Sequence, residues 1–270
     1  MIGHIKVPED IRLSSEEVIQ SLEDWKEIEK FKKKWSKNKP NRKKRRLEKS
    51  GKLEKAKVRK INHVTGTRRI STAQCRENLE MIGLDSDEVR RLKANSVFLG
   101  DKCALAANKL LSRKYPDVNG FEAVTLYEVP HLRTKASPTA ANLLYSGNSE
   151  HFVATLCLKS NFVNYFDSLH PGSKPSKDEL KQITKCYMMD NNKKLTIISH
   201  LCQKQKNNDC LCHAVMNLDI SLSGFDVAKV AVNNSEIRKS LLHSFEEYEL
   251  KFNYENCQYR GAAKVYTYKL

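Results

Sequence analysis

Three features common in secreted and membrane proteins are missing from this sequence. No apolar run approaches the roughly 18 residues needed to cross a bilayer, so we expect no membrane association. The start, Met1-Ile2-Gly3-His4, lacks the charged-then-apolar layout of a secretory signal. The eight cysteines are scattered without a CxxC pair, which argues against a disulfide framework and a structural zinc site. We therefore expect a soluble, intracellular protein with reduced thiols and no cofactor.

Positive charge is concentrated in one segment. The 270 residues carry a formal net charge of +16, and Lys30 to Lys60 holds seventeen Lys or Arg against two acids. Like charge at this density cannot bury apolar surface, so the segment is a solvated linker or an exposed helix. Two functional readings stay open, nuclear import and non-specific contact with nucleic-acid phosphate. Base stacking is not expected, because no aromatic residue follows Trp35 in the segment.

An amphipathic helix is expected before this segment. Ser14 and Glu17 form a capping-box pattern, and apolar residues follow at spacings of three or four from Val18 to Trp35. This helix docks either on the main domain or on a partner. We therefore divide the chain into a helix and basic extension over 1–70, a folded domain over 71–253 and a C-terminal tail over 254–270. The basic segment favours a nuclear location over a cytoplasmic one.

The folded region mixes helical and strand patterns. Ser71 and Gln74 form a capping-box pattern that opens a helix, and Gly83 ends it. Turn signals at 146–149 and 159–160 separate three apolar runs, which predicts antiparallel strands. The mixture predicts an α+β fold with a central mixed or antiparallel sheet flanked by helices. The expected helices are 71–83, 86–94, 102–113, 177–189, 210–218 and 235–252, and the expected strands are 141–145, 151–158, 161–166 and 195–199.

His151 begins one expected strand and Asp167 follows the next. If the two strands form a hairpin about Lys159 and Ser160, these residues lie directly opposite each other, with Cβ atoms about 4.5 to 5.5 Å apart. A carboxylate in that position fixes the tautomer of an imidazole and stabilises its protonated form. The other ring nitrogen is then free to take a proton from a thiol. The alternative is structural, because such an Asp is also a common turn or cap residue.

A polar, turn-forming segment, Leu201 to Asp209, delivers Cys210 to the first turn of an apolar helix. Unpaired backbone N–H groups and the helix dipole stabilise a thiolate there. Cys210 is thus a candidate nucleophile, against the alternative of a buried, inert thiol. Gln203 or Gln205 would place a side-chain amide beside the Cys210 backbone N–H as an oxyanion hole. Cys212, in the same helix, is expected to belong to the core.

The order His, Asp, Gln, Cys runs through three stretches, His151 to Thr155, Val163 to Leu169 and Gln203 to Cys210. This order resembles the ubiquitin-like protease family, the Ulp or sentrin-type cysteine peptidases, and most of all its short, transposon-associated members. The family pattern is His-Trp, a strand ending in Asp-Ser, a Gln, a short polar loop and Asp-Cys-Gly. Phe98 to Asp101 and Ile237 to Leu242 are similar to its entry segment and closing helix, so the resemblance covers about 87–252.

The resemblance implies a papain-like cysteine peptidase fold of the ubiquitin-like protease type and a role for each matching residue. His151 is the general base, Asp167 orients it, Cys210 attacks the scissile carbonyl, and Gln205 completes the oxyanion hole. Phe152 stands where the family has the Trp that closes the substrate channel. Family members cleave after a diglycine at the end of small, SUMO-like modifiers. The resemblance therefore implies a thiol-dependent peptidase or isopeptidase with a ubiquitin-like modifier as its partner.

Two positions depart from the family pattern. Leu211 follows the cysteine where the family has Gly, which has no Cβ near the site. The family's Gln lies six residues before its Cys, and this sequence has Lys204 at that position. Gln205 would fit if the loop is one residue shorter than in the family, and Gln203 would fit if it is one residue longer. We favour Gln205. A second hypothesis follows from these departures. It is a protease-fold module from a mobile element, weakly active or inactive, that binds a modifier or, through Lys30 to Lys60, nucleic acid.

Overall fold

The computed structural model describes residues 70–94, 97–121, 140–146, 150–159, 161–187 and 194–269. The helix expected from Ser14, the basic segment Lys30 to Lys60 and turn residues 147–149 lie outside these ranges. Within them, none of the helices has both the length and the apolar character needed to cross a membrane. The same ranges hold no group of three or more His, Cys, Asp or Glu arranged to bind a metal ion.

The described residues form an α+β domain in which helices flank a mixed sheet, as the sequence predicts. Five strands follow the order β1-β2-β3-β4-β7, and β5 and β6 form a separate two-stranded sheet. The β3–β4 pair is parallel, and the other pairs of the large sheet are antiparallel. The strands are β1 (Ala140–Ser146), β2 (His151–Lys159), β3 (Phe162–Phe166), β4 (Lys194–Ser199), β5 (Val230–Ala231), β6 (Glu255–Asn256) and β7 (Lys264–Lys269); the helices are α2 (Thr72–Ile82), α3 (Ser86–Lys93), α4 (Asp101–Lys114), α5 (Lys177–Cys186), α6 (Cys210–Leu222) and α7 (Ile237–Glu246).

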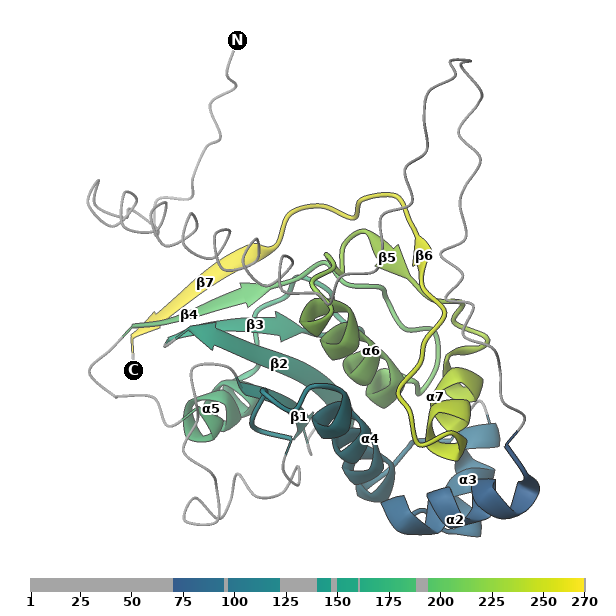
Figure 1. The fold of residues 1–270 in the computed structure, drawn as a ribbon. Helices are drawn as coiled ribbons and strands as arrows, with labels where there is room; N and C mark the ends of the chain where they lie inside the picture. The colour runs from purple at the N-terminus through teal and green to yellow at the C-terminus, as the bar shows by residue number, and fades with distance from the viewer. Residues whose placement is uncertain are drawn as a thin grey trace, which may run out of the picture. The chain divides into compact units, whose positions relative to one another are not determined.

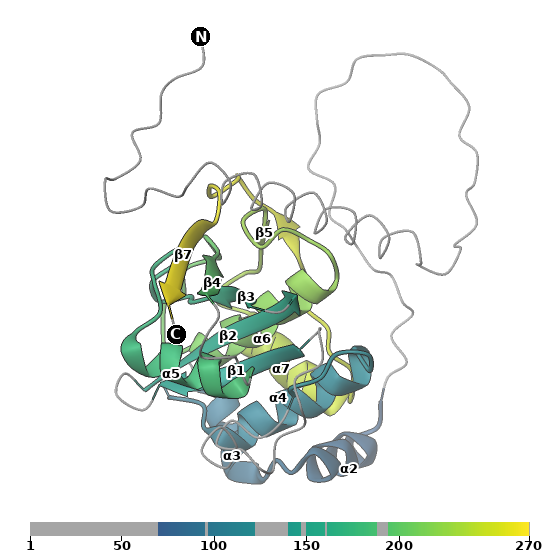
Figure 2. The same cartoon turned by 90° about the vertical axis from the view of Figure 1, so that its left-hand side faces the viewer.

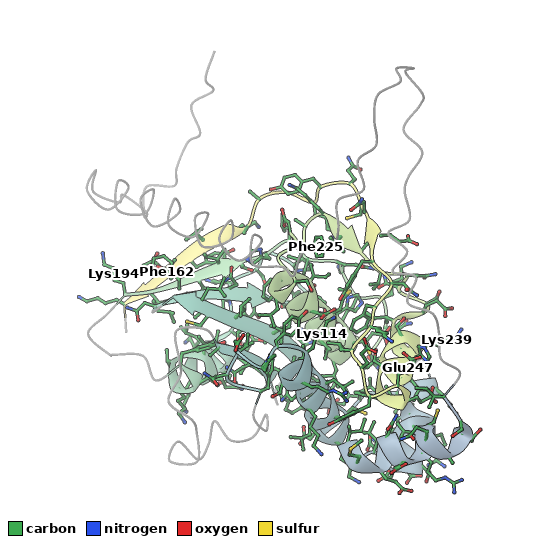
Figure 3. All side chains as sticks on the ribbon, in the orientation of Figure 1. Lys114, Phe162, Lys194, Phe225, Lys239 and Glu247 are labelled. Atoms are coloured by element: carbon green, nitrogen blue, oxygen red, sulfur yellow. The ribbon has the colours of Figure 1, made fainter. Side chains whose placement is uncertain are left out.

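Residues 254–270, expected to form a tail beyond the domain, contribute β6 and β7 instead. β7 pairs along its whole length with β4, from Lys194 opposite Lys269 to Ser199 opposite Lys264. Tyr254 anchors the start of this segment, because its hydroxyl donates to the buried Asp219 of α6. Lys114, at the end of α4 and beside α6 in Figure 3, places its Nζ 2.6 Å from the same carboxylate. The folded domain therefore continues to residue 269.

The β2–β3 hairpin has a different register from the one expected. Phe166 pairs with Ala154, two residues along from the expected partner Phe152. The reason is the turn, where an irregularity near Lys159 and a left-handed Asn161 (φ 67°) lengthen the connection. An even shift keeps every side chain on its expected face, because side chains alternate with a period of two. His151 and Asp167 are therefore not directly opposite, but they still project from the same side.

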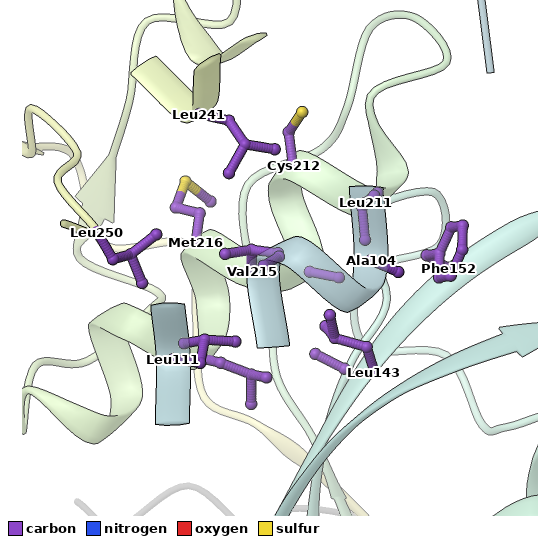
Figure 4. Close-up of a cluster of buried hydrophobic side chains, with 14 of the residues drawn as sticks. Ala104, Leu111, Leu143, Phe152, Leu211, Cys212, Val215, Met216, Leu241 and Leu250 are labelled. Atoms are coloured by element: carbon purple, nitrogen blue, oxygen red, sulfur yellow. The ribbon is translucent and has the colours of Figure 1, made fainter. Parts of the chain in front are cut away.

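Apolar clusters cover both faces of the sheet. Phe152, Ala154 and Leu156 of β2 pack into a large cluster with the helices of one layer. Val153 and Cys157 point the other way, into a smaller cluster with α5. Figures 1 and 2 show α5 on one face and α4, α6 and α7 on the other, and Figure 4 shows side chains from α4, α6 and α7 meeting in the larger cluster. Two-sided burial explains why β2 is apolar at almost every position.

Two helices end earlier than their apolar patterns suggest. The helix expected over 235–252 spans only Ile237–Glu246, and Tyr248 after it takes a left-handed conformation (φ 52°). The helix expected over 177–189 ends at Cys186.

The two helix starts differ in their capping. Ser176 and Glu179 form a full capping box at the start of α5. At the start of α2, Ser71 accepts from the Gln74 backbone N–H, but the Gln74 side chain bonds to Glu77 and Asn78 and not back to Ser71.

Candidate active site

The paired strands β2 and β3 place His151 and Asp167 in contact. His151 is the first residue of β2, and Asp167 follows the last residue of β3. Their atoms Nε2 and Oδ1 are 2.8 Å apart, and each residue is 4% exposed. Because the carboxylate can only accept, His151 donates through Nε2–H. The other ring nitrogen, Nδ1, is therefore the one left to face a reacting group.

The Asp167 carboxylate is fixed by hydrogen bonds from two backbone N–H groups besides the one from His151. Its Oδ1 also accepts from the backbone N–H groups of Leu169 and His170, at 2.8 and 3.1 Å. Burial raises the pKa of Asp167, but the hydrogen bond and charge of His151 and these two N–H groups outweigh it, so the pKa lies below its ordinary value. The carboxylate is thus ionised at neutral pH. It is oriented by the turn in which it lies.

Cys210 is the first residue of α6, as the sequence predicts. The first turn of a helix has backbone N–H groups without intrahelical acceptors, and the Asp209 side chain makes no capping bond to them. Burial lowers the pKa of His151, but hydrogen bonds to Asp167 and Cys210, together with their charges, raise it to about 9. His151 therefore lies between the carboxylate and the thiol. At neutral pH it is a cation beside the sulfur.

A pocket of about 280 Å³ opens onto this group. Cys210 is only 3% exposed, and its side chain lines this pocket, through which another molecule can approach it. Its volume is at the lower limit for sites that enclose small molecules, which suits a narrow, extended chain. The lining residues are Phe98, Glu150, His151, Leu169, Gln205, Lys206, Asn207, Asn208 and Cys210.

The two glutamines considered for the oxyanion hole have different surroundings. Gln205 lines the pocket together with Cys210 and His151. Gln203 is outside the pocket lining, and its side chain bonds to Val232 and Asn234, with Nε2 donating to both and Oε1 accepting from the Val232 N–H. Gln203 is thus bonded to the segment that follows β5. Gln205 is the one glutamine of the pair that a reacting carbonyl in the pocket would meet.

The aromatic residue that lines the pocket is Phe98, and not Phe152 as expected. Phe152, assigned to substrate binding from the sequence, is fully buried at 0% exposure and does not line the pocket. Phe98 lines it instead and stacks on Phe152, with ring centroids 5.6 Å apart. Tyr145 packs against both rings, at 5.1 Å from Phe152 and 5.9 Å from Phe98. Phe152 therefore supports the wall from behind, because it points into the larger apolar cluster.

Leu211 does not crowd the pocket. Its side chain is fully buried in the larger cluster, near Phe152 and Ala104 in Figure 4, and is absent from the pocket lining. Cys212 is buried in the same cluster, as expected, and burial raises the pKa of its thiol above its ordinary value. The first turn of α6 thus presents Cys210 to the pocket. The two residues that follow point into the protein.

An ion pair that the sequence did not reveal supports the loop before Cys210. Arg238 of α7 donates through Nε to Asp209 Oδ1 at 2.5 Å, and both side chains are 3% exposed. Its Nη2 donates to the carbonyls of Val97 and Asn208, and its Nη1 to those of Arg91 and Ala94. Arg238 thereby joins the segment before Phe98 to the segment before Cys210. Its place in the closing-helix motif was visible in the sequence, but its partners were not.

No protein-family model and no curated protein matches this chain. Among solved structures, the chain is similar to the C-terminal Ulp1 protease domain in complex with Smt3, the yeast ortholog of SUMO. The two sequences are 15% identical, the match covers 73% of this chain and 100% of that chain, and the TM-score is 0.46. It is also similar to the SUMO protease Ulp1 with its catalytic cysteine oxidised to a sulfonic acid, with 17% identity, 67% and 98% covered, and a TM-score of 0.48. A third is the Chaetomium thermophilum Ulp1-like SUMO protease catalytic domain, with 13% identity, 67% and 91% covered, and a TM-score of 0.44. These likenesses are distant, at 13–17% identity.

Proposed function

We propose that the protein is a thiol-dependent peptidase or isopeptidase that hydrolyses the bond after a C-terminal Gly-Gly of a SUMO-like modifier. The observation that carries this proposal is the placement of His151 between the Asp167 carboxylate and the Cys210 thiol. A carboxylate, an imidazole and a thiol in this order form the imidazolium–thiolate pair that nucleophilic catalysis by cysteine requires. The resemblance of the His, Asp, Gln, Cys order to ubiquitin-like proteases supports the choice of substrate.

The reaction has two stages. The Cys210 thiolate attacks the carbonyl carbon of the last glycine, and the negative oxygen accepts from the Cys210 backbone N–H and the Gln205 amide. His151 then donates its proton to the departing amine, which leaves a thioester between the substrate and Cys210. In the second stage His151 takes a proton from a water molecule as the water oxygen attacks the thioester. The bond between the carbonyl carbon and the Cys210 sulfur then breaks, which releases the modifier with a free C-terminal carboxylate and returns the thiolate beside the imidazolium. Asp167 keeps the imidazole oriented in both stages.

The shape of the pocket supports a glycine-containing tail. Cys210 is 3% exposed, and Phe98 and Leu169 line the same pocket. A residue with a large side chain at the scissile position would have to displace these walls, whereas glycine has no side chain to place. The polar side chains and backbone of 205–208 lie on the same pocket and can meet the amides of an extended chain.

Cleavage of modifier precursors and of lysine-linked conjugates tests the proposal. The full chain is incubated with SUMO-type and ubiquitin substrates, and the products are identified by mass spectrometry. We expect cleavage after Gly-Gly by the wild type and by Cys212→Ala, a matched control for a cysteine in the same turn. We expect none by Cys210→Ala. Absence of cleavage by folded wild type across the panel would contradict the proposal.

The binding-only hypothesis makes a different prediction. It rested on Leu211 and on the shifted glutamine, but Leu211 packs into the core and Gln205 lines the pocket. Neither feature therefore favours an inactive module over an enzyme. If wild type fails to cleave but binds a modifier as well as Cys210→Ala does, the binding module is the better account.

We also propose a nuclear location and an origin among transposon-associated members of the family. The seventeen basic residues of Lys30 to Lys60 support the first, and the short His, Asp, Gln, Cys pattern supports the second. A fluorescent fusion of the full chain should concentrate in the nucleus, and a fusion without residues 30–60 should not. Contact with nucleic acid through this segment would appear as binding that weakens steeply with salt.

A further inference from the structure

We propose that Ser168 is a positioning residue that fixes the Gln205 amide in the orientation needed for oxyanion binding; this inference rests on the proposed function. Ser168 is 2% exposed and follows Asp167 at the end of β3. Its Oγ donates to Gln205 Oε1 at 2.7 Å. The Gln205 backbone N–H donates back to the Ser168 carbonyl at 2.9 Å. Two hydrogen bonds therefore join residues that are 37 positions apart in the sequence.

The Ser168 hydroxyl sets the orientation of the Gln205 side-chain amide. The carbonyl oxygen of a glutamine can only accept and its nitrogen can only donate, so a donor at Oε1 fixes the position of Nε2. Gln205 Nε2 donates to the Asn207 carbonyl at 2.9 Å, the one acceptor found for it within the described ranges. An amide nitrogen has two N–H groups, and Gln205 lines the same pocket as Cys210. The second N–H is therefore available to an oxygen in the pocket.

The segment Asp167-Ser168 thus orients two different parts of the site. Asp167 holds the imidazole of His151 through Nε2, and Ser168 holds the amide of Gln205 through Oε1. Without the Ser168 hydroxyl, Oε1 loses its side-chain donor and the amide can turn its oxygen toward the pocket. An acceptor there would repel the negative oxygen of the tetrahedral intermediate. The rate of the chemical step would fall, while binding of the modifier elsewhere would not change.

Four variants of the full chain test this role against a fluorogenic amide of a SUMO-like modifier ending in Gly-Gly. Ser168→Ala should lower kcat by about 10-fold and leave KM within about twofold, and Ser168→Thr should restore most of kcat. Gln205→Ala should lower kcat by ~100-fold. The double variant should be no slower than Gln205→Ala, because Ser168 acts through that amide. A double variant slower than Gln205→Ala by the full Ser168→Ala factor would overturn the proposal.

Ser199→Ala is the matched control for loss of a buried hydroxyl. Ser199 is fully buried and its Oγ donates to the Ser173 carbonyl at 2.7 Å, outside the pocket lining. We expect it to lower the melting temperature about as much as Ser168→Ala without changing kcat. Equal loss of kcat in both variants would show that Ser168 is only structural.

A nuclear magnetic resonance experiment separates this inference from the proposed function. In wild type the two Gln205 side-chain N–H protons should give sharp, distinct signals that Ser168→Ala broadens or shifts, and Ser168→Thr should preserve them. Unchanged Gln205 signals in Ser168→Ala would overturn the positioning role whether or not the protein cleaves a modifier. Changed signals without any cleavage would support the role of Ser168 in orienting Gln205 and contradict the proposed peptidase function.

Discussion

Replacing Asp167 with Asn should remove the charge that keeps His151 protonated. The Asn side chain still offers an oxygen to the backbone N–H groups of Leu169 and His170, so the turn should survive. Burial lowers the pKa of His151, and the hydrogen bonds and charges of Asp167 and Cys210 raise it from 6.5 to about 9. That rise corresponds to roughly 3 kcal/mol in favour of the imidazolium, at about 1.4 kcal/mol per pH unit. We expect the variant to lose most of it.

The sign of the effect follows from this shift. In the wild type His151 stays protonated until the pH rises through about 9, and its contribution to the free energy of unfolding is fully present below about 6.5. In Asp167→Asn only the hydrogen bond and charge of Cys210 still oppose burial, so the imidazolium should be lost near pH 6.5. Between these values the variant therefore lacks the imidazolium that the wild type holds beside the Cys210 sulfur.

Alkylation of Cys210 by iodoacetamide measures this directly. The rate is followed by peptide mass spectrometry between about pH 5 and 10, with the unfolding temperature checked at each pH. At pH 7 we expect Asp167→Asn to react at least ~10-fold more slowly than wild type, with its rate rising at higher pH. Asp117→Asn, an exposed change of the same charge, is the control and should match wild type. The same pH profile in Asp167→Asn and wild type would refute the reasoning.

Three further changes have defined outcomes. Arg238→Met leaves Asp209 buried without its ionic partner, so urea unfolding should show a loss of about 3–5 kcal/mol, against under ~0.5 kcal/mol for the exposed Lys239→Met. Burial lowers the pKa of His213 to about 4, so wild-type stability should fall from pH 6.5 toward 4 by up to about 1.4 kcal/mol per pH unit more than that of His213→Leu. Leu211→Ala should cost about 2–5 kcal/mol in the same urea assay and give no faster cleavage, because Leu211 is a core residue.

Each of these outcomes can fail in a specific way. Arg238→Met within ~1 kcal/mol of wild type would show that its ion pair with Asp209 contributes little. Parallel pH curves for wild type and His213→Leu would show that His213 is not held neutral by burial. Faster cleavage by Leu211→Ala would show that Leu211 obstructs the site and restore the concern raised by its position after the cysteine.

The parts of the fold that depend on local signals were predictable from the sequence. Apolar spacing and cap residues located α2 to α7 and the four strands β1 to β4, because these patterns act within a few residues. β7 was missed although Val265 to Tyr268 are all residues that favour strands; its partner β4 lies about 70 positions away in the sequence, and no local pattern indicates that pairing. The β2–β3 register was off by two because the left-handed Asn161 and the adjacent irregularity are set by packing.

The residues that meet at the candidate site were more predictable than the residues that line its pocket. His151, Asp167, Cys210 and Gln205 were proposed from residue type and order; the structure brings His151, Cys210 and Gln205 to one pocket and places Asp167 behind the pocket, against His151. Phe152 was misassigned, because sequence order alone does not tell which of two stacked rings faces the pocket. Contacts with Ser168 and Arg238 join segments far apart in the chain and therefore needed the structure.

Covalent labelling with a SUMO-like modifier that ends in Gly-Gly-vinyl sulfone tests the central claim most directly. The probe places an electrophile where the scissile carbonyl would lie, so it reacts only with a thiolate at the end of a channel that accepts the tail. We predict one adduct per wild-type chain, mapped by mass spectrometry to Cys210, none in Cys210→Ala, and full labelling of Cys212→Ala. Labelling of another cysteine, or no labelling of folded wild type by any common modifier probe, would contradict the assignment of Cys210 as the nucleophile.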